Sequence, residues 1–248
     1  ANPKETAMAA VCVAVLFIAI WLGWAARPAY QDYWRSKGYP ATLAELNGRY
    51  KSVPDAENRA LDYLELASIV EEKEHAIYST ESRFSSLSDA TRNYENVLIA
   101  GIASVERNEP IPANVWEATD WYWQDVSRHV VPSLKSVATN GKAESRYPID
   151  LNRGHDVELP HLAQVRGLAR QLYIDALRSA VHGQPSAATD SVLAIFPIAD
   201  SLKNEPIVIS GLVRVAIFGI SFGAIQDLMN RVQLPDEDLV RIRSALEE

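Results

Sequence analysis

The side chains best spaced for metal or acid–base chemistry lie within seven residues: His155, Asp156, Glu158 and His161. Imidazole and carboxylate groups on one loop can surround a divalent ion or act as general acid and base in a hydrolase. Their spacing matches no zinc signature, because the second ligand pair of structural zinc sites is missing. We therefore expect no metal site, and we interpret His161 as a solvated residue in the first turn of a helix.

No nucleophile or phosphate-binding motif occurs in the chain. The G-x-S-x-G, P-loop and H-E-x-x-H patterns are all missing. The single cysteine, Cys12, excludes an intrachain disulfide and any multi-cysteine metal site. We expect no catalytic residue, no cofactor and no enzymatic activity, with a hydrolase built on His155 and neighbouring carboxylates as the third-ranked alternative.

Four aromatic side chains fall within eight residues: Trp116, Trp121, Tyr122 and Trp123. Such a cluster can stack on a sugar or anchor a partner chain, because tryptophan and tyrosine are enriched at binding hot spots. Trp116 and Trp123 are seven residues apart and can face a core. Core packing is the favoured interpretation for most of the cluster. Successive residues of one helix cannot all point inward, however, so at least one ring is left for a partner, and all four are candidate partner-binding residues.

The charge balance argues against nucleic acid as a partner. The 248 residues are 48% hydrophobic and 23% charged, which is a globular composition. Acidic residues outnumber basic ones by 32 to 24, and the formal net charge is −8. That balance removes the electrostatic attraction on which nonspecific nucleic-acid binding depends.

A membrane segment is predicted near the start of the chain. The run from Ala7 to Ala26 holds no charge and is long enough to cross a bilayer. Aromatic side chains that favour the headgroup layer gather at its end: Trp21, Trp24, Tyr30, Tyr33 and Trp34. A cleaved signal peptide is the alternative, but the apolar run is long and no good cleavage site follows it. We predict a flank over residues 1–6 and an uncleaved single-pass helix over residues 7–27 in the lipid bilayer.

A connector over residues 28–56 and a first helical region over residues 57–139 follow. The pattern Thr42-Leu43-Ala44-Glu45 predicts a short capped helix in the connector. Asp55 can cap a longer helix whose inward residues are Leu61, Leu64, Ser68 and Ile69. A further helix precedes Pro110, and the next one carries Val126, Val130, Leu134 and Val137 on its inward face. Pro132 should kink or divide this last helix.

Residues 140–158 form an irregular loop, where we place the main internal boundary before a hairpin array over residues 159–248. Proline and glycine divide this array into helices. The apolar faces of its first two helices consist of Leu162, Val165, Ala169, Leu172, Ala176 and Ala180, then Ala188, Val192, Ile195, Ala199 and Leu202. The last helix should turn Leu239, Ile242 and Leu246 inward.

The helix after Pro206 is apolar on nearly every side and permits two interpretations. It can be a second membrane span, or a central helix enclosed by its neighbours. Arg214 would cost a few kcal/mol at the centre of a bilayer. We therefore favour the buried central helix.

These elements predict an all-α fold, in which one N-terminal transmembrane helix precedes an array of antiparallel α-hairpins. Short connections after residue 183 force neighbouring helices to be antiparallel. The turn Gly183-Gln184-Pro185 with the following Ala188 is similar to tetratricopeptide hairpins.

Several stretches resemble an uncharacterised family of membrane-anchored helical proteins, with a tetratricopeptide-like array, from planctomycete-type bacteria. The resemblance covers the chain from about residue 40 to its end, and it rests on the stretches 42–46, 53–58, 159–164 and 205–210 together with Val213-Arg214. It implies a membrane anchor near the N-terminus, a helical domain on the non-cytoplasmic, periplasmic side and no known activity. The positive-inside rule weakly favours the opposite side, because Arg27, Arg35 and Lys37 follow the anchor while only Lys4 precedes it.

The leading functional hypothesis is a non-enzymatic, membrane-anchored interaction or scaffold protein, an accessory subunit of a larger membrane assembly. Its expected partners are the bilayer and other membrane protein subunits. The alternative is a membrane-tethered binding module for a small molecule or a cell-wall sugar, which would use the aromatic cluster at Trp116–Trp123.

Overall fold

The computed structural model describes residues 27–79, 120–142 and 144–247. Within these ranges every regular element is a helix, and the only β pairing is an isolated bridge between Asn58 and Glu144. The all-α prediction is therefore confirmed for the described residues. The predicted transmembrane helix and the predicted helix before Pro110 lie outside them.

Two compact units divide the chain differently from the predicted boundary at residues 140–158. The N-terminal unit combines residues 1–51 with residues 149–157, and the helical unit combines residues 52–148 with residues 158–248. Both predicted helical regions therefore belong to one unit. The predicted irregular loop is shared between the units, and its 3₁₀ segment Leu151–Asp156 is bound within the N-terminal unit by a hydrogen bond from Leu151 N–H to Asn47 Oδ1 (3.1 Å).

The N-terminal unit contains a helical segment over residues 27–36 and the short helix α2, Leu43–Arg49. Thr42 Oγ1 accepts a hydrogen bond from Glu45 N–H (3.2 Å), as the capping pattern predicted. The Glu45 carboxylate reaches back to Ala41 N–H (2.8 Å), one residue beyond the expected donor, and pairs with Arg35 (2.8 Å). Local hydrogen bonds thus hold this small unit together.

Helix α3, Arg59–Ser79, begins later and turns a different face inward than the sequence predicted. Asp55 lies in a 3₁₀ turn, and Asn58 caps the helix by accepting a hydrogen bond from Ala60 N–H (3.2 Å). The buried residues are Ala60, Tyr63, Leu66, Ala67 and Val70. The predicted face was wrong, since Leu61, Leu64 and Ile69 are only half-buried and Ser68 is exposed.

Helix α6, Arg128–Thr139, follows a π-helical turn over Trp123–Ser127. Val126, Val130 and Leu134 are fully buried as predicted. Pro132 does not divide the helix, since α6 continues through this residue. A proline ring crowds the carbonyl four residues earlier, here that of Arg128. The wide π turn ends at that point, which relaxes the backbone where the ring would otherwise clash.

Helices α7 (Pro160–Val181), α8 (Pro185–Leu193) and α9 (Ile195–Asp200) form the centre of the helical unit. Every residue predicted to face inward from this stretch is buried. Gly183, with a φ of 70°, makes the turn between α7 and α8. The single helix predicted after this turn is instead divided at Ala194, because Pro197 has no N–H for the Leu193 carbonyl.

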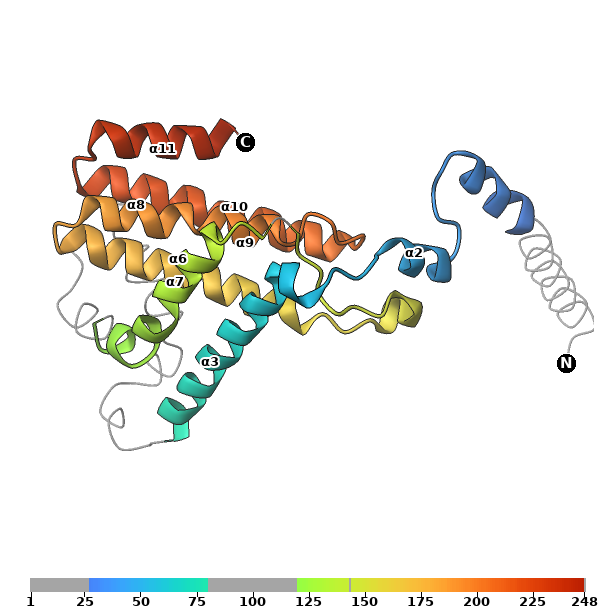
Figure 1. Ribbon diagram of the computed structural model, residues 1–248, viewed down its shortest axis with the longest axis horizontal. Helices are drawn as coiled ribbons and strands as arrows, with labels where there is room; N and C mark the ends of the chain where they lie inside the picture. The colour runs from blue at the N-terminus through green and yellow to red at the C-terminus, as the bar shows by residue number, and fades with distance from the viewer. Residues whose placement is uncertain (1–26, 80–119, 143, 248) are drawn as a thin grey trace, which may run out of the picture. The chain divides into compact units, whose positions relative to one another are not determined.

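Helices α10 (Val208–Arg231) and α11 (Asp236–Glu247) complete the helical unit. Figure 1 shows α7, α8, α10 and α11 running side by side, with α3 crossing α7 at an angle. In α11 only Ile242 of the three predicted inward residues is buried, since Leu239 and Leu246 are exposed. The predicted enclosure of α10 was also wrong, because only 28% of its most apolar stretch is buried.

Candidate interaction surface

One side of α10 packs against α7, α8 and α9. Its buried residues are Ser210, Ile217, Ser221, Ala224, Ile225, Asp227 and Leu228. The Asp227 carboxylate accepts a short hydrogen bond from the Tyr173 hydroxyl on α7. Arg214 forms an ion pair with Asp200 (2.7 Å). Specific polar contacts as well as apolar packing therefore attach this side to the helical unit.

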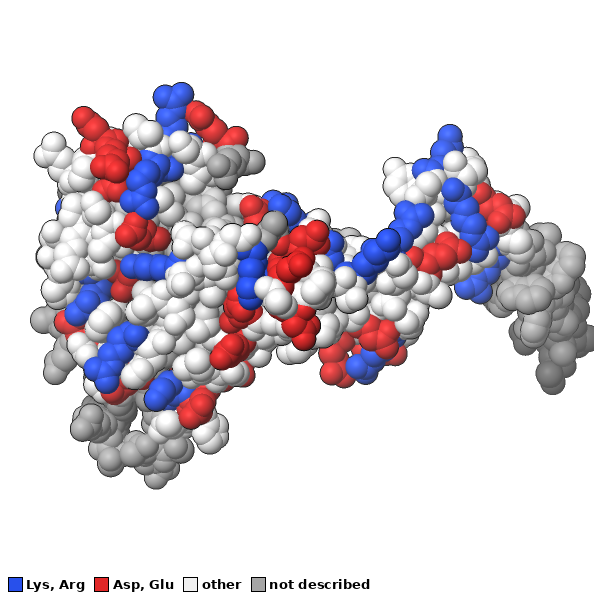
Figure 2. All heavy atoms as spheres, in the orientation of Figure 1, with Lys and Arg blue, Asp and Glu red and all other residues white. Residues whose placement is uncertain are grey.

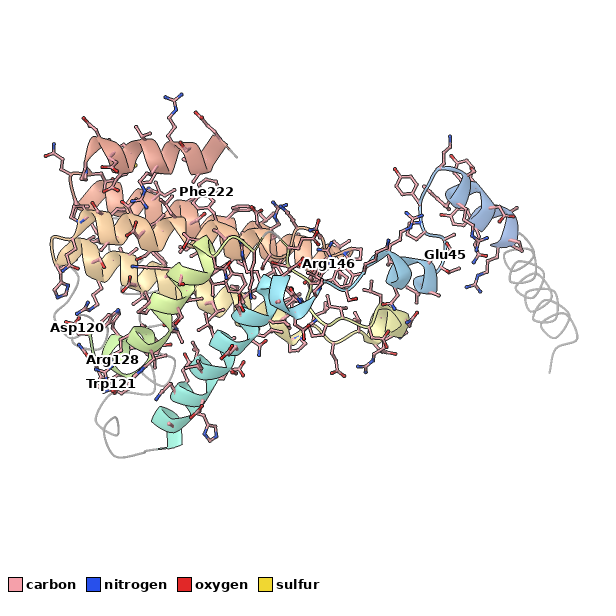
Figure 3. All side chains as sticks on the ribbon, in the orientation of Figure 1. Glu45, Asp120, Trp121, Arg128, Arg146 and Phe222 are labelled. Carbon is pink, nitrogen blue, oxygen red and sulfur yellow. The ribbon has the colours of Figure 1, made fainter. Side chains whose placement is uncertain are left out.

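The opposite side of α10 is apolar and faces solvent. Six large side chains on it are between 52% and 82% exposed: Val208, Ile209, Leu212, Val215, Phe222 and Met229. Phe222 is labelled in Figure 3. Arg214 is the only charged residue from Val208 to Gln226, and its guanidinium turns to Asp200 and the Phe218 ring. This side is an uncharged strip about five helical turns long.

The exposed residues of this strip follow a regular spacing. Positions 208, 212, 215, 219, 222, 226 and 229 are all exposed and alternate steps of four and three residues. We call this set the α10 seam: Val208, Leu212, Val215, Gly219, Phe222, Gln226 and Met229. A four–three alternation aligns side chains along one line of a helix and is the spacing through which helices pack in coiled coils. The seam therefore has the geometry of a surface for another helix.

Glycines make this side of α10 unusually narrow. A Cβ atom placed on Gly211, Gly219 or Gly223 would meet no atom within 4 Å. A glycine inside a helix costs about 1 kcal/mol relative to alanine. Packing within the described chain does not offset that cost, because these positions open onto free space. They would allow a second backbone to approach α10 closely.

Two members of the predicted aromatic cluster make polar contacts inside the helical unit. Tyr122 is 2% exposed; its hydroxyl donates to Glu74 (2.5 Å) and accepts from Gln171 (2.6 Å). Trp123 donates to Asp175 (2.8 Å), and the Arg178 guanidinium covers its ring at 4.0 Å. Tyr122 is therefore enclosed in the helical unit, whereas Trp123 is half-buried with one face of its ring covered.

The other two aromatic residues remain open as partner-binding residues. Trp121, which is labelled in Figure 3, is half-buried. Trp116 lies outside the described residues. Of the predicted interface residues near the anchor, Tyr30 and Tyr33 are exposed and make edge-to-face contacts with Trp34, whereas Trp21 and Trp24 lie outside the described residues.

The candidate metal or hydrolase residues are divided between the two units. His155 and Asp156 belong to the N-terminal unit and are exposed, whereas His161 belongs to the helical unit. The interpretation of His161 as solvated was wrong. Its Nε2 lies 2.9 Å from Glu205 Oε1, its ring stacks on Tyr147 at 4.5 Å, and the residue is 4% exposed. Among the described residues, no group of three histidine, cysteine or acidic side chains is placed to hold a metal ion.

Charged side chains of both signs are interspersed over the face of the helical unit that Figure 2 shows. This view contains no broad basic patch of the kind that binds nucleic acid. The α10 seam is thus the most distinctive surface feature of the described helical unit. Sequence periodicity does not reveal the seam, because apolar residues occur on every side of α10.

The helix that carries the seam is also the one described helix that is long and apolar enough to cross a membrane. Comparisons with protein-family models, with curated proteins and with solved structures found no match for this chain.

Proposed function

We propose that this chain is a non-enzymatic, membrane-anchored interaction protein that works as a subunit of a larger membrane assembly. The observation that carries the proposal is the exposed, uncharged α10 seam. Monomeric soluble proteins rarely expose a continuous apolar surface of this length unless it binds a partner or a membrane. A four–three spacing with open glycines supports a helix of another protein chain as the partner.

A membrane span is a less favourable role for α10 than a docking surface. Its packed side carries Ser210 and Asp227, and it contacts α7 and α9. Insertion into lipid would separate Asp227 from Tyr173 and Arg214 from Asp200. Polar groups without partners are costly in hydrocarbon. The anchor in this proposal is therefore the segment at residues 7–27, with the helical unit on the periplasmic side, as the family resemblance implies.

The rival function, a sugar-binding module, has less support. Ring stacking on a sugar requires an open aromatic face. Tyr122 is buried, and Arg178 already covers the Trp123 ring. The exposed apolar surface therefore favours a protein partner over a carbohydrate.

The proposal is tested by extracting the full chain from its native membrane in mild detergent and identifying the proteins that co-purify at fixed stoichiometry. Leu212→Glu and Val215→Glu place a carboxylate on the seam, where their wild-type side chains are 63% and 67% exposed. Val181→Glu is the matched control, since Val181 is exposed at the end of α7. Circular dichroism checks that each variant remains folded.

The expected result is loss of the co-purifying chain in both seam variants and its retention in the control. A carboxylate buried in an apolar interface has no partner, so binding should weaken by an order of magnitude or more. Equal recovery of the same chain from wild type and both seam variants would overturn the assignment of the seam as the docking surface.

A further inference from the structure

We infer that the α10 seam binds the α10 seam of a second copy of this chain, with the two helices antiparallel and their closest approach at Gly219. The inference rests on the proposed docking function and names the partner. It follows from the symmetry of the seam, its area and its glycines.

The seam is nearly symmetric about Gly219. On one side its members lie 4, 7 and 11 residues away, and on the other side 3, 7 and 10 residues away. An antiparallel copy would therefore place Val215 against the second copy's Phe222. Leu212 would meet its Gln226, and Val208 its Met229. A two-fold interface requires such a self-complementary surface, in which one residue contacts another and the reverse contact also forms.

The exposed apolar area is close to what one side of a stable dimer buries. If a fully exposed large side chain presents on the order of 150–200 Å², the five large apolar side chains of the seam together leave roughly 550 Å² in solvent. A standard interface buries about 800 Å² on each partner. Side chains flanking the seam can supply the remainder, so the seam suffices as the core of a dimer contact.

The glycines favour a helix over lipid as the occupant. Lipid chains gain most from large apolar side chains, and a glycine offers them almost no apolar area. A second helix gains from glycines, because they bring the two backbones together. Gly219 and Gly223 lie at the middle of the strip, where two crossing helices approach most closely.

Electrostatics favour the antiparallel arrangement. The strip from Val208 to Gln226 brings no like charges together, since its only charged residue, Arg214, is paired with Asp200. Antiparallel helices also place the positive N-terminal end of each dipole beside the negative C-terminal end of the other. A parallel pair would align like ends.

The first experiment measures the mass of the purified full chain in detergent by light scattering and sedimentation, over a hundredfold range of concentration. Wild type and Val181→Glu are expected to be dimers. Val215→Glu is expected to be mainly a monomer over the same range, with a dimer dissociation constant at least ten times that of wild type. A monomeric wild type, or a Val215→Glu variant that dimerises like wild type, would overturn the inference.

The second experiment tests the arrangement with single cysteines in a Cys12→Ser background and a mild oxidant such as copper phenanthroline. Gly219→Cys should form a disulfide-linked dimer, because a disulfide needs two Cα atoms within about 7 Å. Val208→Cys alone should not, since its two copies would lie about 33 Å apart along the helix. Mixing Val208→Cys with Met229→Cys chains should restore the crosslink. Efficient crosslinking of Val208→Cys to itself would show parallel helices and contradict the proposed arrangement.

Failure of this inference is distinguishable from failure of the proposed function. If the purified chain is monomeric but the seam variants still lose a different protein during native extraction, the docking function stands and the second copy is not the partner. If the purified chain is monomeric, no protein crosslink forms and the seam variants lose no protein during native extraction, the seam is not a protein-docking surface and both proposals are overturned.

Discussion

Removal of the Glu205 carboxylate should destabilise the helical unit strongly. Glu205 lies between α9 and α10, and its side chain is 1% exposed. Its Oε1 is 2.9 Å from His161 Nε2, and the His161 ring stacks on Tyr147. Glu205→Ala would leave the buried imidazole without this contact, at the point where α7 meets the turn before α10.

The expected magnitude follows from the burial of both partners. Breaking a buried pair costs about 3–5 kcal/mol when the remaining group is charged and about 1–3 kcal/mol when it is a neutral hydrogen-bonding group, because that group stays desolvated. Glu205 Oε2 is buried without a hydrogen-bond partner, so the carboxylate already bears a desolvation cost that the substitution relieves. We therefore expect Glu205→Ala to lower the free energy of unfolding by about 3 kcal/mol, where the two ranges meet.

Urea unfolding of the full chain, followed by helical circular dichroism, measures this effect. With a slope of about 2 kcal/mol per molar urea, the midpoint should fall by about 1.5 M. Glu205→Gln keeps a polar contact with His161 and should lose only about 1 kcal/mol. A loss below about 1 kcal/mol for Glu205→Ala would refute the reasoning, because a buried pair cannot be broken at so small a cost.

Three further predictions concern other contacts. Asn58→Ala removes the α3 cap and two hydrogen bonds with the Arg146 backbone. The free energy of unfolding, measured in urea, should therefore fall by about 2–3 kcal/mol, and a fall of less than about 0.5 kcal/mol would contradict this. Leu134→Ala empties a fully buried position and should lower stability by about 2–5 kcal/mol in a thermal melt, whereas an unchanged melting temperature would place Leu134 outside the core. The hydrogen bond from Ala41 N–H, followed by that from Arg35, holds the pKa of Glu45 below its usual 4.5. The support that Glu45 gives α2 is therefore complete above about that pH and is lost as the pH falls through the lower folded pKa. Protection of the α2 amides against hydrogen exchange, measured relative to the intrinsic rate at each pH, should fall there in wild type but not in Glu45→Gln; the same loss of protection in both chains would exclude Glu45 as the cause.

The sequence predicts α7 well because a continuous stripe of apolar residues runs along the helix and its ends carry clear signals. Pro160 opens the helix and Gly183 closes it, and all six predicted inward residues are buried. The capping pattern at Thr42 succeeds for the same reason, since it depends on contacts within four residues. Local signals are sufficient where the local and tertiary structures agree.

The face of α10 could not be predicted in this way. Apolar residues on every side leave no periodic signal, so composition alone cannot distinguish an enclosed helix from one with a bare apolar side. The tertiary structure decides between them, because α7, α8 and α9 cover only the side that carries Ser210 and Asp227.

The buried polar contacts of the helical unit could not be predicted from the sequence for a different reason. His161 and Glu205 are 44 residues apart, and neither forms part of a recognisable motif. The sequence also does not reveal that Arg178 covers the Trp123 ring, because the two residues are 55 positions apart. Such contacts depend on the tertiary packing of the helices, and the local pattern of a single sequence does not predict them.

The most direct test of the central claim is photo-crosslinking in intact membranes, with a benzoylphenylalanine in place of Val215 on the seam or, as a control, in place of Val181 on α7. The account predicts a covalent protein adduct at position 215, with twice the mass of the chain if the partner is a second copy, and none at position 181. Illumination that yields no protein adduct at position 215, or equal adducts at both positions, would contradict the claim that the α10 seam is a protein-docking surface.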